Sequence, residues 1–508
     1  MRDIVDVAII GGGISGLYAA WRLQTAVSPP RTVHLYEMSQ RAGGRLLSVA
    51  PPEMSGIQAE LGGMRFLTNQ PLVSRLIAHL ELPAAPFPVS GPENIYFVRG
   101  QHLRHRDFAN PDQVPYRLSW RERGKTPGQL IAEAIDMIVP GAAQLNADQW
   151  QHVKETYRFN GRFLYEQGFW NLLHQVLSSE AYEFIMDAGG YDTTLTNWNA
   201  AEAIPWYLAD FGQDAVYMKL TDGYERLPQT IAARFAAAGG QLHLGRRLRD
   251  FSRGADAAGA PLLSLRFADG ETIQARHLIL AMPRRSLELL DPDGDTPFFS
   301  HPTLRRLLPT VTPHPMFKLF LCYRYPWWQD AGVDVGRSVT DLPLRQVYYF
   351  GSETAGPAPQ HAEMRDSLVM ASYDDGRFVG FWTGLADPED IAALPPTGTP
   401  WDAYQAPQGM ITHAQRQLRQ VHDLPYIPEP YAAAFMDWGQ DPFGGAWNSW
   451  NIHVKAWEVR QQMIQPLPDW PVYVCGEAYS AAQGWVEGAL QTAEAVLGKL
   501  GLAPPDYS

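Results

Sequence analysis

Residues 5–26 read VDVAIIGGGISGLYAAWRLQTA. A β-branched apolar run ends in three glycines and leads into an apolar-patterned segment, which is typical of a strand, a tight turn and a helix. A second apolar run, TVHLYE at residues 32–37, follows the helical segment. Because a helix between two strands lets them lie parallel, the pattern predicts a βαβ unit at the start of the chain.

The turn carries a glycine spacing that suits a dinucleotide. Gly11, Gly13 and Gly16 form G-x-G-x-x-G around Ser15, and Glu37 stands 21 residues after Gly16. The glycines permit a sharp turn and close approach to a pyrophosphate, which the helix N-terminus attracts, while the carboxylate accepts from ribose hydroxyls. A plain structural turn is the alternative. The combination predicts that these five residues bind a dinucleotide.

Composition excludes several classes of protein. The chain has 508 residues, of which 12% are aromatic and 19% charged, an ordinary globular composition that excludes disorder as the main state. Its net charge of −13 disfavours a nucleic-acid partner. No apolar run approaches the ~20 residues of a membrane helix, so no membrane partner is expected.

Cys322 and Cys475 are the only cysteines. Two cysteines exclude a disulfide framework and a CxxC metal site, and both lie in apolar, strand-like runs, so we expect buried free thiols and no metal. With no signal peptide before the first strand, the sequence predicts a soluble cytoplasmic protein.

Strand-like and helical runs along the chain predict an α/β fold with a discontinuous Rossmann-like domain. Further strand-like runs occur at residues 241–245, 262–267, 272–282 and 471–476. The middle of the chain is more helical and aromatic, and strand-like runs return after it. The predicted nucleotide-binding domain comprises residues 1–70, 216–300 and 425–508; a mixed-sheet substrate domain comprises residues 71–119 and 301–424; and a helical insertion spans residues 120–215.

Three segments resemble a known family. Residues 37–45 (EMSQRAGGR), 60–66 (ELGGMRF) and 475–490 (CGEAYSAAQGWVEGAL) resemble the FAD-dependent amine oxidase superfamily, and most closely its L-amino acid oxidase branch. The resemblance covers nearly the whole chain, although its specific motifs are confined to the first ~70 and last ~40 residues. It implies that the nucleotide is FAD, held in a GxGxxG-type domain.

The resemblance also implies cofactor contacts. Gly44 and Arg45 would lie by the FAD pyrophosphate, Glu477 would bond the ribityl or phosphate region, and Val486 would offer its backbone N–H to the flavin. A surface ion pair is the alternative for Arg45. In monoamine oxidases a cysteine that binds FAD covalently follows a Gly-Gly pair where this chain has Ala446, so FAD is expected to be non-covalent. Further cofactor contacts are expected at Met64, Arg65, Leu248 and Trp485.

Substrate class depends mainly on Arg65. A guanidinium fork matches a carboxylate bidentately, so an arginine beside the flavin selects amino acids over simple amines. A salt bridge to FAD or to the protein is the alternative. By resemblance, Tyr373 would assist Arg65, the Gly484 carbonyl would accept from the substrate ammonium, and Trp485 would form an aromatic wall. For both aromatic residues a purely structural core role is the alternative.

Lys318 lies inside the apolar run MFKLFLCYRY. A buried ammonium is costly without a partner, which makes this lysine a candidate catalytic residue. The family has a lysine at such a position, which holds a water against flavin N5 and speeds the reaction of reduced flavin with oxygen. An edge-strand lysine is the alternative.

The resemblance implies oxidative deamination of an L-amino acid by oxygen, giving a 2-oxo acid, ammonia and hydrogen peroxide. Abundant Trp and Phe favour large neutral or aromatic substrates, and a homodimer is expected. Two alternatives stay open: an L-amino acid 2-monooxygenase, which would give an amide, and a redox-silent FAD-binding scaffold.

Overall fold

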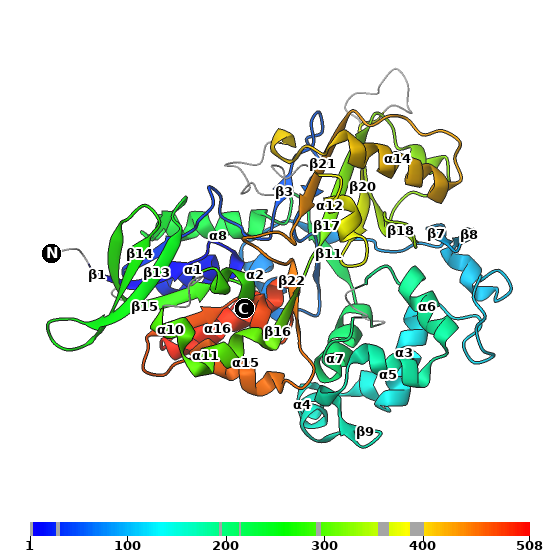
Figure 1. Ribbon diagram of the computed structural model, residues 1–508. Helices are drawn as coiled ribbons and strands as arrows, with labels where there is room; N and C mark the ends of the chain where they lie inside the picture. Colours follow the sequence, from blue (N-terminus) through cyan, green and yellow to red (C-terminus); the bar gives the residue numbers. More distant parts are fainter. Residues whose placement is uncertain are drawn as a thin grey trace.

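Two seven-stranded sheets and a group of helices make up the protein (Figure 1). The computed structural model describes residues 4–26, 31–192, 196–212, 215–290, 296–353, 365–386 and 401–507. The predicted α/β class is confirmed. Among the described residues, no helix combines the length and the apolar character needed to cross a bilayer.

The first sheet contains the predicted βαβ unit. Strand β1 lies between β2 and β15, and all three are parallel to one another, as is β12 at the edge beside β2. Alternate side chains of β1 enter two different hydrophobic clusters, which is typical of a parallel sheet covered on both faces. The strands are β1 (Ile4–Ile10), β2 (Val33–Tyr36), β12 (Gln241–His243), β13 (Leu248–Ala255), β14 (Pro261–Phe267), β15 (Thr272–Ala281) and β23 (Val472–Cys475).

Helices from both ends of the chain cover one face of this sheet. α1 packs against both α8 and α16 in one hydrophobic cluster, so the N-terminal and C-terminal segments share a core. The predicted strands at residues 241–245, 262–267, 272–282 and 471–476 all lie in this sheet. The helices are α1 (Ile14–Thr25), α2 (Pro71–His79), α8 (Arg226–Ala237) and α16 (Val486–Lys499), with α9 (Arg284–Glu288), α10 (Pro297–Ser300), α11 (Pro302–Leu307) and α15 (Ala456–Ile464) elsewhere in the chain.

The second sheet has strand order β21-β17-β20-β19-β18-β7-β8. Strand β17 is buried along its whole length and pairs on both sides, so the alternative of an edge-strand lysine at Lys318 is wrong. The strands are β7 (Ile95–Val98), β8 (Gln101–Arg104), β17 (Phe317–Tyr323), β18 (Arg337–Thr340), β19 (Gln346–Ser352), β20 (Ser367–Asp374) and β21 (Ala432–Asp437), and α12 (Val379–Thr383) and α14 (Gln408–His422) pack nearby.

A helical group forms a third hydrophobic cluster (Figure 1). Thr126 begins α3 with a capping box to Gln129, and Asn146 begins α4 with a capping box to Gln149, so local sequence fixes both starts. The helices are α3 (Pro127–Ile138), α4 (Ala147–Thr156), α5 (Phe169–Val176), α6 (Ser179–Ala188) and α7 (Ala200–Phe211).

The remaining strands form short pairings that connect the larger parts. Strand β21 lies in the second sheet, although residues 425–508 as a whole were assigned to the nucleotide-binding domain; its antiparallel pairing with β17 explains the difference. The domain boundaries therefore stay predictions. The strands are β3 (Ser48–Val49) with β4 (Ala59–Glu60), β5 (Phe66–Leu67) and β6 (Ala84–Pro86) with β11 (Tyr217–Leu220), β9 (Arg158–Phe159) with β10 (Arg162–Phe163), and β16 (Val311–His314) with β22 (Trp447–Trp450).

Candidate active site

One cavity extends from the glycine-rich turn after β1 to the buried lysine of β17. It brings together every residue predicted from the sequence except Gly16. The predicted residues that line it are Gly11, Gly13, Ser15, Glu37, Gly44, Arg45, Met64, Arg65, Leu248, Lys318, Tyr373, Glu477, Gly484, Trp485 and Val486.

Two glycines of the turn are required by close packing. Gly11 has φ +112°, and a Cβ there would lie 2.4 Å from the Ala281 carbonyl oxygen. Gly16 does not line the cavity, and its contact with the cofactor stays a prediction. A Cβ on Gly16 would lie 2.0 Å from the Gly11 carbonyl oxygen, so its role is to let α1 pack against the turn.

The N-terminus of α1 faces the cavity without a side-chain cap. Gly13 is the N-cap residue, it makes no side-chain cap hydrogen bond, and the first turn contains no acidic residue. Gly13, Ile14 and Ser15 line the cavity. A helix N-terminus with uncapped N–H groups attracts anions, so this end of the cavity suits a pyrophosphate.

Glu37 is held by the backbone on both sides of its carboxylate. One oxygen accepts from Gly12 N at 2.7 Å and the other from Ser39 N at 2.8 Å. A carboxylate has about four acceptor positions, so capacity remains for ribose hydroxyls on the cavity side.

Arg45 and Glu477 form an ion pair on the cavity wall. Arg45 Nη1 lies 2.7 Å from Glu477 Oε1 and donates to the Ala446 carbonyl at 2.6 Å. Glu477 also accepts from Asn448 Nδ2 at 2.7 Å and from Gly484 N at 3.1 Å. The pair therefore connects the segment after β2 with the segment before α16, and the alternative of a surface ion pair at Arg45 does not apply.

Arg65 is buried among tyrosines. Its guanidinium donates to the Tyr348 hydroxyl at 3.2 Å and to the Tyr191 hydroxyl at 2.5 Å, and it lies 4.5 Å from the centre of the Tyr217 ring. No ion pair joins Arg65 to a carboxylate among the residues that the structure describes. Phenol oxygens and ring faces stabilise the cation only in part, so an anionic ligand would complete its environment.

Asp210 is a carboxylate whose charge acts on Arg65. Its carboxylate accepts from the Tyr217 hydroxyl at 2.8 Å, and burial raises the pKa of Asp210 to about 6. Asp210 thus adds negative potential near Arg65 without forming an ion pair with it.

Lys318 reaches the cavity from the middle of the second sheet. Its Nζ donates to the Glu60 carbonyl at 2.9 Å and to the Gly62 carbonyl. Burial lowers the pKa of Lys318 and raises the pKa of Glu60, while the attraction between the two groups opposes both shifts. An ammonium has three N–H donors, so one donor is left for a ligand or a water on the cavity side.

Aromatic walls complete this end of the cavity. Tyr373 pairs with Lys318 across β20 and β17, and no hydrogen bond joins its hydroxyl to the described residues. Trp206 and Trp447 stack with ring centres 6.0 Å apart, and both line the cavity beside Trp485. Gly484 has φ +81°, which favours glycine at that turn.

Sequence reasoning missed Tyr191, Tyr217, Tyr348 and Asp210. Tyr191 is 126 residues and Tyr348 is 283 residues from Arg65, and neither belongs to a segment that resembles the family. Local sequence contains no signal that would have found them.

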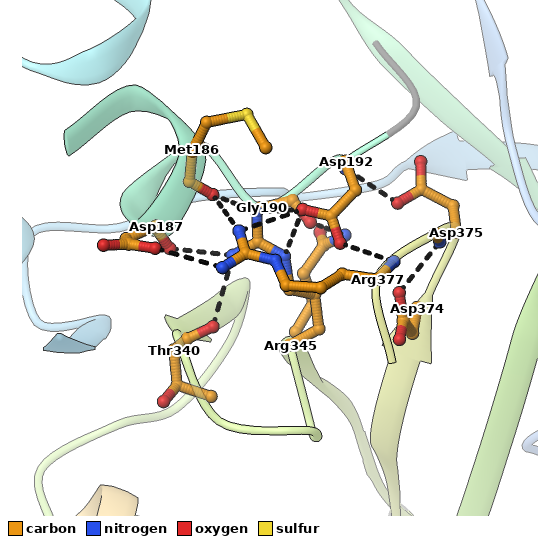
Figure 2. Close-up of polar contacts among 12 residues, drawn as sticks. Met186, Asp187, Gly190, Asp192, Thr340, Arg345, Asp374, Asp375 and Arg377 are labelled. Atoms are coloured by element: carbon orange, nitrogen blue, oxygen red, sulfur yellow. Dashed lines mark hydrogen bonds and ion pairs between the residues drawn. The ribbon is translucent and has the colours of Figure 1, made fainter. Parts of the chain in front are cut away.

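A group of three buried carboxylates lies at this end of the cavity, and one of them, Asp375, lines it. One ligand oxygen from each of Asp192, Asp374 and Asp375 lies within 4.8 Å of the others. Arg345 and Arg377 donate to Asp192, so guanidinium groups already supply positive charge there (Figure 2). The group carries no metal assignment.

The turn, the Glu37 carboxylate and the cavity define a dinucleotide-binding protein of the GxGxxG type. The chain belongs to the flavin-containing amine oxidoreductase family, whose family model matches residues 14–496. It is an oxidoreductase with FAD as its cofactor, and the Rossmann-like FAD domain with a substrate domain is confirmed.

Similar proteins align with nearly the whole length of this chain. Aplysianin-A of Aplysia kurodai is 26% identical over 97% of this chain and 90% of its own length. An L-amino acid oxidase of Bothrops pictus is 25% identical over 96% of this chain and 88% of its own. The structure of wild-type putrescine oxidase bound to putrescine superimposes with a TM-score of 0.68 at 18% identity, covering 98% of this chain and 99% of that one. That likeness shows the shared fold.

Proposed function

We propose that the protein catalyses FAD-dependent oxidative deamination of L-amino acids with large neutral or aromatic side chains. The products are a 2-oxo acid, ammonia and hydrogen peroxide. When bound, FAD would accept a hydride from the substrate α-carbon and pass the electrons to oxygen. The protein residues bind the substrate and orient it.

The observation that carries this proposal is the environment of Arg65. It is a buried guanidinium on the cavity wall, bonded to two phenols and paired with no carboxylate among the described residues. A substrate carboxylate supplies the missing negative charge, whereas a simple amine would place a second cation beside the first. The L-amino acid oxidases among the relatives support the same substrate class.

The other residues of the cavity orient the substrate around that contact. The Tyr373 hydroxyl donates to the same carboxylate, and the Gly484 carbonyl accepts from the substrate amine. Trp206, Trp447 and Trp485 line the cavity and form an apolar wall that suits a large neutral or aromatic side chain. Fixing the carboxylate and the amine fixes the direction of the α-hydrogen.

Lys318 acts in the reaction with oxygen. Two of its N–H donors are used by carbonyls. The third is proposed to hold a water at the cavity side. A positive charge at this position stabilises negative charge that develops on oxygen.

A panel of L-amino acids tests the proposal with the FAD-loaded protein. Under nitrogen, large neutral and aromatic L-amino acids should bleach the flavin absorbance, and D-isomers should not. In air, one peroxide and one 2-oxo acid should form per substrate consumed. An amide product would indicate a 2-monooxygenase instead, and the absence of bleaching with every amino acid would indicate a redox-silent scaffold.

We also propose a homodimer and a cytoplasmic location. The two cysteines are free and buried, as predicted, which is compatible with a reducing compartment. Light scattering of the purified holoenzyme tests the dimer.

A further inference from the structure

The loop after α6 is anchored by two arginines. Arg345 is fully buried and donates Nε to Asp192 Oδ1 at 3.1 Å, and it also donates to the carbonyls of Asp187 and Met186 at the end of α6. Arg377 contacts the same oxygen of Asp192 at 3.3 Å and the carboxylate of Asp187 at 3.3 Å. Figure 2 shows both guanidinium groups directed at this loop. The backbone around Asp192 is therefore held from two sides.

A hydrogen bond joins this loop to the end of β20. Asp375 Oδ1 accepts from Asp192 N at 2.9 Å. Asp192 directly follows Tyr191, and Asp375 is two residues after Tyr373. The bond thus connects the two chain segments whose tyrosines line the cavity beside Arg65.

The two tyrosines contact each other, and Tyr191 also contacts the guanidinium of Arg65. The rings of Tyr191 and Tyr373 meet edge to face, with centres 5.8 Å apart. The Tyr191 hydroxyl receives one N–H of Arg65 and lies 2.8 Å from the Tyr348 hydroxyl. A displacement of the loop would therefore remove a donor–acceptor contact from Arg65 directly.

We propose that Asp375, Asp192, Arg345 and Arg377 form a positioning group that sets the affinity of the cavity for the substrate carboxylate. This inference rests on the proposed function, because it assumes that the carboxylate binds at Arg65. Of the four only Asp375 lines the cavity, and none is assigned a contact with the reacting atoms. The group acts through Tyr191, which is bonded to Arg65, and through Tyr373, which packs against Tyr191.

The orientation of Arg65 affects affinity because a bidentate contact with a carboxylate depends on geometry, whereas the attraction of a single charge does not. Two-point recognition of a carboxylate needs the guanidinium plane fixed within a small angle, and the Arg65 plane is fixed by the tyrosine hydroxyls. Loss of one supporting hydrogen bond leaves the charge of Arg65 in place but releases its orientation. Ground-state binding weakens, and the chemistry of a substrate that does bind is affected less.

Replacement of Asp375 tests the proposal. Asp375→Ala removes the acceptor for Asp192 N and should raise KM for an L-amino acid and Kd for benzoate about tenfold, with kcat changed less than about twofold. Asp375→Asn keeps an oxygen acceptor at the same place, so it should restore both constants to within about threefold. The matched control is Asp437→Ala at the end of β21, which removes an aspartate that accepts from Gly439 N at 2.7 Å and does not line the cavity. It should leave KM and Kd unchanged.

Arg377→Ala is the second variant, in case Asp375→Ala fails to fold. The Arg377 side chain is 35% exposed, so its removal leaves little buried volume empty, and it should raise benzoate Kd several-fold. Arg324→Ala, which removes an arginine paired with Glu53 and Asp366, is its control. A fall in thermal stability with unchanged Kd in both Asp375→Ala and Arg377→Ala would make the group merely structural and overturn the proposal.

Crystal structures of the variants separate this inference from the proposed function. In Asp375→Ala the Tyr191 hydroxyl should leave Arg65, whether or not any carboxylate binds. An unmoved Tyr191 would overturn the positioning proposal even if the wild-type protein oxidises amino acids. A wild-type protein that binds no carboxylate, with a displaced Tyr191 in the variant, would instead count against the proposed function alone.

Discussion

Both terminal nitrogens of Arg65 are hydrogen-bonded to phenol oxygens. These bonds hold the planar guanidinium in one orientation, which a lysine ammonium cannot reproduce. We expect Arg65→Lys to raise KM for L-amino acids and to weaken competitive carboxylates by about ten- to a hundredfold, because an ammonium loses a charged hydrogen bond worth about 1.5–3 kcal/mol. Steady-state kinetics and inhibitor titrations measure both. Arg41→Lys is the control, since Arg41 is equally buried but pairs with Glu225 outside the cavity. An unchanged KM with reduced FAD content would assign Arg65 to the cofactor.

Replacement of Lys318 should affect the two half-reactions, flavin reduction and flavin reoxidation, to different extents. Lys318→Met keeps the approximate length of the side chain and removes its charge, so reoxidation of reduced flavin by oxygen should slow far more than reduction by substrate. In the wild-type protein, reoxidation should slow as the pH rises, because burial lowers the pKa of Lys318 and deprotonation removes the same charge. Stopped-flow absorbance measures each rate separately. Slower reduction with normal reoxidation would show that Lys318 positions the substrate instead.

At the scale of the element, the end of β20 should make stability depend on pH. Asp374 is fully buried, one of its oxygens has no hydrogen-bond partner, and burial with the charges of Asp192 and Asp375 raises its pKa to about 7, although Arg345 opposes the shift. Asp374 therefore stays protonated in the folded protein at pH values at which the unfolded chain has already lost this proton. The contribution of Asp374 to stability is therefore largest below the unfolded pKa and is lost as the pH rises towards 7.

Asp374→Asn removes this titration while keeping the shape of the side chain. Between pH 5 and pH 8 the wild-type melting temperature should fall more than that of Asp374→Asn, and the variant should be relatively more stable at pH 8. Differential scanning calorimetry of the holoenzyme gives both values, with Asp437→Asn as the control variant. Parallel curves for wild type and Asp374→Asn would contradict the prediction.

Local sequence predicts some elements of this fold but not how they pack together. The strand, turn and helix of residues 5–26 were predicted because their signals, a β-branched run, glycines and an apolar face, lie within one short segment. The strand around Lys318 was predicted too, but its central place in the sheet depends on pairing with β20 and β21, which no local pattern records. Tyr348 lies on β19 within the second sheet, and Tyr191 follows α6, which packs against β18 and β7 of that sheet. Both tyrosines therefore reach Arg65 only through tertiary packing, so their role could not be predicted from sequence.

At the scale of the whole molecule, the cavity joins segments from both ends and the middle of the chain, and FAD should hold them together. Gly13, Leu248 and Val486 line one cavity yet belong to three distant segments. A ligand that binds only the folded state raises stability by mass action. FAD-free protein should therefore melt at a lower temperature, which rises with the concentration of added FAD.

The same cavity predicts that the cofactor is released intact on denaturation. Ala446 lines it where a linking cysteine would stand, no cysteine or histidine is among its described lining residues, and both cysteines of the chain are buried elsewhere. Acid precipitation of the yellow holoenzyme should thus leave all of the flavin in the supernatant, where chromatography should identify it as FAD. Flavin that stays with the pellet would mean a covalent bond to another side chain, and a nicotinamide in the supernatant would contradict the cofactor assignment itself. The two measurements are linked, because only a non-covalent FAD can restore the melting temperature of the FAD-free protein when it is added back.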